Sequence, residues 1–338
     1  MTHAMTRETV RWAGVLALLG LAVMALGLGV GSQGWEAISV MGGDPVQQQI
    51  VWDIRWPRSL GAWLAGALLG LAGAVAQGLF RNPLADPYLL GSASGASLGV
   101  SLYLSVAGGS VLGAGGWQRL GMTGAAFVGA VGAVLLTLLL ARGVQQTLRL
   151  LLAGVVVGVV LGALASLAAL LQPQVLQAMQ GFMLGSTAFV GGASCALMAG
   201  ALAVSLGVGV ALARVLDALT LGEATARSLG VPLGAARIGL IAVLSLATGA
   251  AVAQTGLIAF VGLAAPHAVR SRVHTTHAGL LVLSALMGGV LLQSADVLAR
   301  GLLAPQDLPV GMFTAVLGGV YLLWRMQRVH PAVNGDRT

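Results

Sequence analysis

The sequence predicts an all-α integral membrane protein with about ten transmembrane helices. Hydrophobic residues make up 57% of the 338 residues and charged residues only 8%, whereas soluble domains carry roughly 25% charge. The mean hydropathy is +0.93. The apolar runs are continuous rather than alternating, which excludes a β-barrel. A chain of this composition cannot cover a water-facing surface.

Ten apolar segments account for the predicted helices, because each is bounded by polar residues or by proline and glycine. A helix that crosses the bilayer needs about 20 apolar residues. The expected spans are 12–31, 58–80, 89–107, 121–141, 149–171, 190–213, 234–253, 257–271, 279–300 and 309–327. We interpret the first as a retained helix, since it is longer than the usual ~7–15-residue core of a signal peptide. The chain, 1–338, is expected to form a single transmembrane domain.

The basic residues predict the orientation. All 17 are arginine, and cytoplasmic loops of membrane proteins are enriched in positive charge. With both termini in the cytoplasm, thirteen arginines lie inside and four outside. Their scatter over many loops argues against a nucleic-acid partner. The four outer exceptions, which need a reason of their own, are Arg55, Arg58, Arg119 and Arg300.

The residue inventory argues against an enzyme. Without lysine the chain has no Walker A motif, so any ATP must bind to another polypeptide. It has neither a zinc-protease motif nor a serine-hydrolase motif. Cys195 stands alone in an apolar run and is expected to be a packing residue. His274 and His277 have no acid or cysteine nearby in the sequence, so we expect a solvated loop and no metal site.

The acidic residues weaken a second function class, the ion-coupled secondary carrier. Such carriers usually keep a carboxylate within the bilayer, whereas the ten acids here lie at helix ends and in loops. Asp296 alone approaches a helix interior, and Arg300, one turn away, is expected to pair with it. The carrier and an intramembrane enzyme remain as alternatives.

Small residues recur every four positions in two predicted helices. The repeats include Gly66 and Gly70, with Gln77 further along the same helix, and Gly154 and Gly158. Stripes of this kind let helix backbones approach closely. They also suit the wall of a translocation path, and both interpretations stay open.

Two polar segments interrupt the apolar pattern. The first, FRNPLADPYLLG (80–91), contains two prolines that cannot continue a helix, so it predicts a turn between spans. The second, ARVLDALTLGEATARSLGVPLGAAR (213–237), is amphipathic and carries charges of both signs. It favours short helices on the membrane surface that dock a soluble partner.

Four blocks of sequence resemble one family. RWPRSLGAWLAGALLGLAGAVAQGLFRNPLADPYLLGSASGASLG (55–99) is similar to the signature of FecCD-type permeases, the BtuC-like membrane subunits of type II ABC importers. LGEATARSLGV (221–231), GLIAFVGLAAPHAVR (256–270) and LPVGMFTAVLGG (308–319) resemble three further blocks in the same order. These importers carry ferric siderophores, haem or vitamin B12.

The resemblance implies an assembly in the bacterial inner membrane. Two copies of the chain would surround a central path, with a cytoplasmic ABC ATPase dimer that binds ATP and Mg and a periplasmic substrate-binding protein. The chain itself would hold no cofactor and contact only membrane lipid besides these partners. An iron chelate, either haem or a ferric siderophore, is the cargo expected first, and vitamin B12 is the alternative.

The resemblance also assigns residues. Binding-protein docking falls to Arg55, Arg58 and Arg300, for which pairing with lipid phosphate or with Asp53 and Asp296 is the alternative. A cytoplasmic gate falls to Asn82, Pro83, Leu84, Gly143, Val144, Gln145 and Thr147, although a plain turn without a gating role stays open for its first half. The coupling surface for the ATPase, in helices at about 215–231, includes Asp217, Leu221, Gly222, Glu223, Arg227 and Gly230.

Overall fold

The computed structural model describes residues 6–31, 34–35, 45–107, 116–141, 147–302 and 304–328. Their elements follow in chain order: α1 (Arg7–Leu28), β1 (Val30–Gly31), β2 (Gly34–Trp35), α2 (Pro45–Ile50), the π-helix η1 (Val51–Arg55), α3 (Trp56–Phe80), α4 (Ser92–Val106), α5 (Gly116–Leu140), α6 (Thr147–Leu171), α7 (Pro173–Leu184), α8 (Gly192–Ala211), α9 (Ala213–Thr220), α10 (Glu223–Ser228), α11 (Leu233–Thr255), α12 (Val261–Arg270), α13 (His277–Leu302) and α14 (Val310–Arg328). Strands β1 and β2 pair as a small antiparallel hairpin.

Each of the ten predicted spans has a helical counterpart. Within the described residues, seven helices are long and apolar enough to cross a membrane. Helix α12 has only 10 residues, which is about 15 Å against a hydrocarbon core of about 30 Å. The segment predicted at 257–271 therefore contains a shorter helix than expected, and irregular backbone precedes it. Helix α7 was not predicted, because its glutamines interrupt the apolar pattern on which the spans were based.

Two non-helical segments next to α7 and α12 pack against each other inside the protein. The N–H of Leu257 donates to the carbonyl of Phe182 at 3.0 Å, and that of Ser186 donates to the carbonyl of Thr255 at 2.7 Å. Gly185 has φ 64°, and a Cβ there would lie 2.2 Å from the carbonyl oxygen of Leu257. Irregular backbone is tolerated at membrane depth only when protein satisfies its polar groups, and these mutual hydrogen bonds do so.

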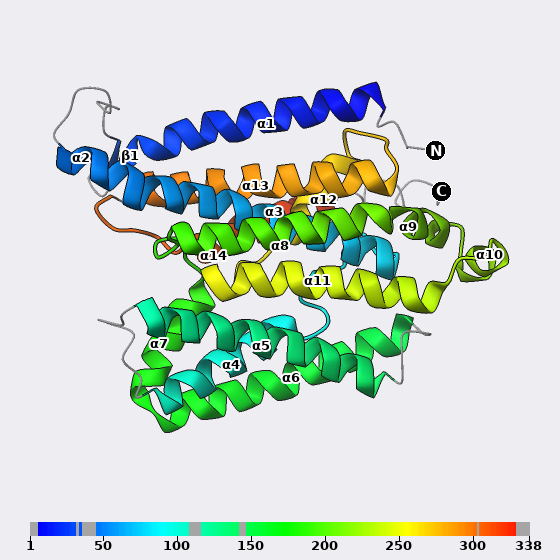
Figure 1. Cartoon of the computed structure of the whole chain (residues 1–338), viewed down its shortest axis with the longest axis horizontal. Helices are drawn as coiled ribbons and strands as arrows, with labels where there is room; N and C mark the ends of the chain where they lie inside the picture. Colours follow the sequence, from blue (N-terminus) through cyan, green and yellow to red (C-terminus); the bar gives the residue numbers. More distant parts are fainter. Residues whose placement is uncertain are drawn as a thin grey trace, which may run out of the picture.

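The helices form two groups (Figure 1). Helices α1, α3, α8, α11 and α13 lie side by side around α3, in which every residue from Leu64 to Phe80 is buried. Helices α4, α5, α6 and α7 form the second group, and α11 packs against both. The buried apolar side chains form two clusters, one centred on α3 that extends to Val134 and Leu150, and one in the second group that includes Val252 and Ala253 of α11. The central position of α3 brings both of its ends, and hence both predicted site regions, into contact with other helices.

Candidate docking, gating and coupling sites

The glycines of α3 serve helix packing. A Cβ on Gly66 would lie 2.2 Å from the carbonyl oxygen of Gly288 in α13, and a Cβ on Gly70 would lie 2.2 Å from that of Ser284. Helices α3 and α13 therefore touch backbone to backbone. The prediction that Gly66 and Gly70 line a path is wrong for this subunit, because another helix of the same chain occupies that face.

Three other residues were predicted to line the path. Gln77 is only 3% exposed; its amide donates to the carbonyl of Leu263 at 3.3 Å and accepts a hydrogen bond from Arg270. It therefore ties α3 to α12 and faces no open space. A Cβ on Gly154 would lie 2.2 Å from the carbonyl oxygen of Leu89, so that glycine too is a packing position. Gly158 is half-buried, and its assignment stays a prediction.

An ionic cluster that is mostly buried except at Asp307 joins the ends of α3 and α13. We call its members, Arg58, Asp296, Arg300 and Asp307, the Arg58 network. The predicted pair forms, with Arg300 Nη2 2.8 Å from Asp296 Oδ2. Arg58 lies 3.4 Å from Asp296 and donates to Asp307 at 2.9 Å. Asp296 is fully buried. Burying ions is costly unless they are paired, and here Arg58 and Arg300 pair with different oxygens of Asp296.

Further contacts hold Arg300 inside the protein. It is 4% exposed, and it donates to the carbonyl of Gly27 at 3.2 Å and to the Ser59 hydroxyl at 3.3 Å. The Thr187 hydroxyl donates to Asp296. Sequence reasoning missed Ser59, Thr187 and Asp307 as members of this cluster, because nothing in their local sequence signals it.

The three predicted docking arginines therefore differ in accessibility. The burial of Arg300 favours the alternative of internal pairing over direct contact with a partner. Arg58 is mostly buried, with its side chain 11% exposed. Arg55 is half-buried and donates to the carbonyl of Leu28 at 3.1 Å. Arg58 is also paired internally, with Asp296 and Asp307, and the docking assignment of Arg55 and Arg58 stays a prediction.

The predicted gate turn is a sequence of tight local bends. The Asn82 side chain accepts from the N–H of Leu84 at 2.9 Å, and Asp86 accepts from the N–H of Tyr88 at 2.8 Å. The Tyr88 hydroxyl donates to the carbonyl of Ile258 at 3.1 Å, which attaches this turn to the irregular segment before α12. Asn82, Pro83 and Leu84 are exposed. Of the second half, Gly143, Val144 and Gln145 lie outside the described residues, and Thr147 is the first residue of α6.

The predicted coupling helices are α9 and α10, which begin and end close to the expected 215–231. Leu221 is 64% exposed, Leu229 is 63% exposed, and Arg227 and Gly230 are exposed as well. Gly222 has φ 101° and permits the sharp turn between the two helices. The outward residues form an apolar and basic surface. Leu229 was not predicted to belong to it, although its spacing from Leu221 on an amphipathic segment was a usable signal.

Asp217 and Glu223 each pair with a residue of the helix bundle. Asp217 lies 2.6 Å from Nδ1 of His277 and accepts from the N–H of the same residue at 3.0 Å. Glu223 pairs with Arg237, which is 3% exposed. The solvated-loop interpretation is wrong for His277, the first residue of α13, because its side chain is 13% exposed and paired. It holds for His274, which is exposed.

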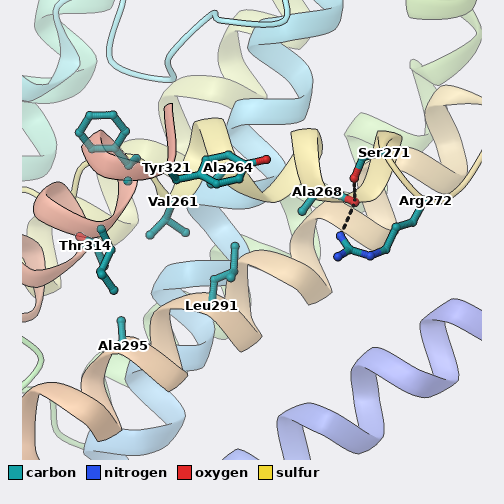
Figure 2. Close-up of a pocket in the computed structure, with 12 residues that line it drawn as sticks. Val261, Ala264, Ala268, Ser271, Arg272, Leu291, Ala295, Thr314 and Tyr321 are labelled. Atoms are coloured by element: carbon teal, nitrogen blue, oxygen red, sulfur yellow. Dashed lines mark hydrogen bonds between the residues drawn. The ribbon is translucent and has the colours of Figure 1, made fainter. Parts of the chain in front are cut away.

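A surface groove of about 510 Å³ lies between α12, α13 and α14 (Figure 2). Its walls are mostly apolar, with Val261, Leu291 and Thr314 among the lining residues. At one end, Ser271 and Arg272 both donate to the carbonyl of Ala268. The groove opens at the edge of the bundle, so it becomes an enclosed space only when another molecule covers it.

Comparison with a family model decides the classification, because the FecCD transport family matches residues 15–328. The chain belongs to the FecCD transport family. The match includes the Arg58 network, the gate turn and the coupling helices.

Individual relatives extend this result. The vitamin B12 import system permease protein BtuC of Escherichia coli O6:H1 is 38% identical, over 94% of this chain and 95% of its own length. The BtuC of Citrobacter koseri is 36% identical over 94% of each chain. A solved metal-chelate type ABC transporter in an inward-facing conformation matches with a TM-score of 0.83 and 28% identity, over 94% of this chain and 98% of that one. The chain is thus a multi-pass ABC transporter permease with the BtuC-like fold.

Proposed function

We propose that this FecCD permease is the membrane subunit of an ATP-driven importer for a corrinoid of the vitamin B12 class. The carrying observation is the 36–38% identity to B12 permeases over nearly the full length of both chains. An iron chelate, haem or a ferric siderophore, is the second candidate. It is favoured by the metal-chelate transporter that shares the fold.

The proposed assembly contains two copies of this chain in the bacterial inner membrane, with N- and C-termini in the cytoplasm. The open groove beside α14 supports a second copy, since a path at the edge of one bundle needs another chain to enclose it. ATP and Mg would be held by a cytoplasmic ATPase dimer that docks on the outward residues of α9 and α10. A periplasmic binding protein would deliver the cargo.

The site residues receive specific roles in this proposal. Arg55 and Arg58 contact carboxylates of the binding protein, because guanidinium groups pair well with carboxylates. Arg300 acts indirectly, through Asp296, by fixing Arg58. The turn at Asn82, Pro83 and Leu84, with Gly143, Val144, Gln145 and Thr147, closes the cytoplasmic end of the path. Nucleotide binding shifts the gates only if the two ATPase states contact the permease differently.

Uptake in proteoliposomes tests the proposal. The permease is reconstituted with its ATPase and binding protein, and ATP-dependent uptake of radiolabelled cyanocobalamin is measured against haem and a ferric siderophore. The corrinoid assignment predicts cyanocobalamin uptake that excess cobinamide inhibits and haem does not. Uptake of the iron chelates alone would replace the first candidate by the second. Uptake driven by an ion gradient without ATP would overturn both.

A further inference from the structure

Two of the contacts that attach the coupling helices to the bundle are polar side-chain pairs, and one of these pairs lies at the start of α13. A single oxygen of Asp217, Oδ1, lies 3.0 Å from the backbone nitrogen of His277 and 2.6 Å from its Nδ1. Because a carboxylate oxygen accepts, both groups of His277 donate to it. We call this contact the Asp217 joint. It aligns α9 with the N-terminal end of α13.

Apolar packing makes the joint a firm contact. Leu216 and Leu219 of α9 are 0% and 1% exposed. A Cβ on Gly78 would lie 3.1 Å from Leu216 and 3.2 Å from the ring of His277. The end of α3, the buried face of α9 and the start of α13 therefore meet at one point.

Helices α3 and α13 remain in contact between their ends. The backbone contacts of Gly66 with Gly288 and of Gly70 with Ser284 lie near the middle of both helices. Packed interiors have few voids and transmit displacement instead of absorbing it. Helix α13 has 26 residues, or about 39 Å of length, so the pair reaches from one side of a bilayer to the other.

The far end of the pair carries the Arg58 network. Asp296 and Arg300 belong to α13, Arg58 belongs to α3, and the buried Thr187 attaches the irregular segment after α7. Thus the helix that receives the Asp217 joint also holds the arginine proposed for binding-protein docking.

We propose that Asp217 and His277 are positioning residues that couple the ATPase to the binding-protein site, with α3 and α13 moving as one rigid pair. This inference rests on the proposed importer function. When the ATPase displaces α9, the Asp217 joint moves α13 with it. Because α3 and α13 move together, the position of Arg58 at their other end changes as well. The second pair, Glu223 and Arg237, leads to α11 instead.

Thermodynamic linkage provides a readout that does not depend on the cargo. If the two sites are coupled, nucleotide changes the affinity for the binding protein by a fixed factor, typically about 5- to 150-fold. The full complex is placed in nanodiscs, and the dissociation constant of substrate-free binding protein is measured with and without a non-hydrolysable ATP analogue. The ratio of the two constants is the coupling factor.

We expect Asp217→Ala and His277→Ala to bring the coupling factor close to 1, with nucleotide binding retained. His277→Asn, which keeps a donor near the Nδ1 position, is expected to restore most of it. Because Asp217 is 40% exposed, His277→Ala leaves no buried charge and is the variant expected to fold. Val100→Ala is the matched control, since Val100 is fully buried in the other apolar cluster. It should lower thermal stability and keep the wild-type factor.

The two failures, of the importer function and of the coupling, are distinguishable. A wild-type complex that shows no ATP-dependent uptake would contradict the proposed importer function, whereas one that takes up cargo but binds the binding protein equally with and without nucleotide would overturn the coupling. If His277→Ala keeps the wild-type coupling factor, the proposed role of the Asp217 joint is wrong, while the proposed importer function is unaffected. Equal loss of coupling in Val100→Ala and His277→Ala would also overturn it, because general destabilisation would then account for the effect.

Discussion

Gly66 of α3 and Gly288 of α13 face each other so closely that a Cβ on either would lie 2.2 Å from the carbonyl oxygen of the other. The contact is reciprocal and involves backbone on both sides, so no side chain can move to make room. It fixes the separation of the two helices that carry the Arg58 network at one end and the Asp217 joint at the other.

Replacing either glycine by alanine should separate the helices. Overpacking of a well-packed interior costs about 1–3 kcal/mol, so Gly66→Ala or Gly288→Ala should lower the free energy of unfolding by that amount in detergent. Gly200→Ala is the control, because nothing lies within 4 Å of a Cβ there, and it should be neutral or slightly stabilising. Equal stability of the Gly66 and Gly200 variants would contradict the packing interpretation.

Removal of Asp296 should destabilise the protein strongly. Asp296→Ala leaves Arg300, which is 4% exposed, as a buried cation without its partner, and breaking a buried pair in this way costs about 3–5 kcal/mol. Asp307→Ala removes a side chain that is 50% exposed and should cost less than about 1 kcal/mol. Thermal unfolding of both variants measures the two losses of stability. If Asp296→Ala is no less stable than Asp307→Ala, the Arg58 network does not stabilise the fold.

The Arg58 network illustrates how far sequence reasoning reaches. The pairing of Asp296 with Arg300 followed from helical spacing alone. The roles of Ser59, Thr187 and Asp307 did not, because they arise from contacts between segments that are distant in sequence. The glycine stripes were also recognised from their spacing. Whether they pack against a helix or line a translocation path depends on which helix faces them, and the spacing does not show that.

Charge reversal tests docking of the binding protein. Arg55→Glu should lower the association rate of the binding protein, and raised ionic strength should reduce the wild-type rate as well, because rim charges mainly steer encounter. Surface plasmon resonance on nanodisc-embedded permease measures both. Arg58 is left unchanged in this test, because it pairs with the buried Asp296 and its reversal would destabilise the fold. Arg272→Glu, on an exposed residue after α12, is the control and should leave the rate unchanged. A rate unaffected by Arg55→Glu would remove the docking assignment of Arg55.

The gate turn should leak when its local hydrogen bond is lost. Asn82→Ala removes the acceptor for the N–H of Leu84, a bond worth about 0.5–1.5 kcal/mol. We expect up to about a tenfold rise in ATP-independent efflux of cyanocobalamin from loaded proteoliposomes. Asn82→Asp keeps an acceptor and should retain the wild-type leak. Identical leaks in all three proteins would favour a plain turn.

The same turn predicts a pH effect. Burial raises the pKa of the Asp86 carboxyl, and this outweighs the opposing hydrogen bond from Tyr88. A raised pKa means that the folded state binds the proton more tightly than the unfolded state. The stabilising contribution is therefore complete below the ordinary pKa of 3.8 and is lost as the pH rises through the raised value.

Asp86→Asn should remove this dependence. The amide still accepts from the N–H of Tyr88 and carries no proton to lose. The variant is expected to unfold at a higher temperature than the wild type at pH 7 and to match it near pH 4. If the melting temperatures of the variant and the wild type changed with pH in the same way, the pKa of Asp86 would not differ between the folded and unfolded states.

The differences between the predicted and observed helices, at α7 and α12, also have a physical cause. Long apolar runs predicted the main spans because a bilayer imposes a minimum length. Helix α12 is short because the preceding backbone turns through Gly256 and Phe260, both with positive φ. Long-range hydrogen bonds from Leu257 to Phe182 and from Tyr88 to Ile258 stabilise that turn. Such paired irregular segments leave no periodic signal.

The division of the helices into two groups makes the architecture modular. Every residue of the Arg58 network and the Asp217 joint lies outside 92–184, the stretch that holds α4 to α7. A chimera that received this stretch from another member of the family would therefore keep every residue of the Arg58 network and of the Asp217 joint. Substitutions within this one contiguous block of the gene would leave untouched the contacts that we propose to link the ATPase to the binding protein.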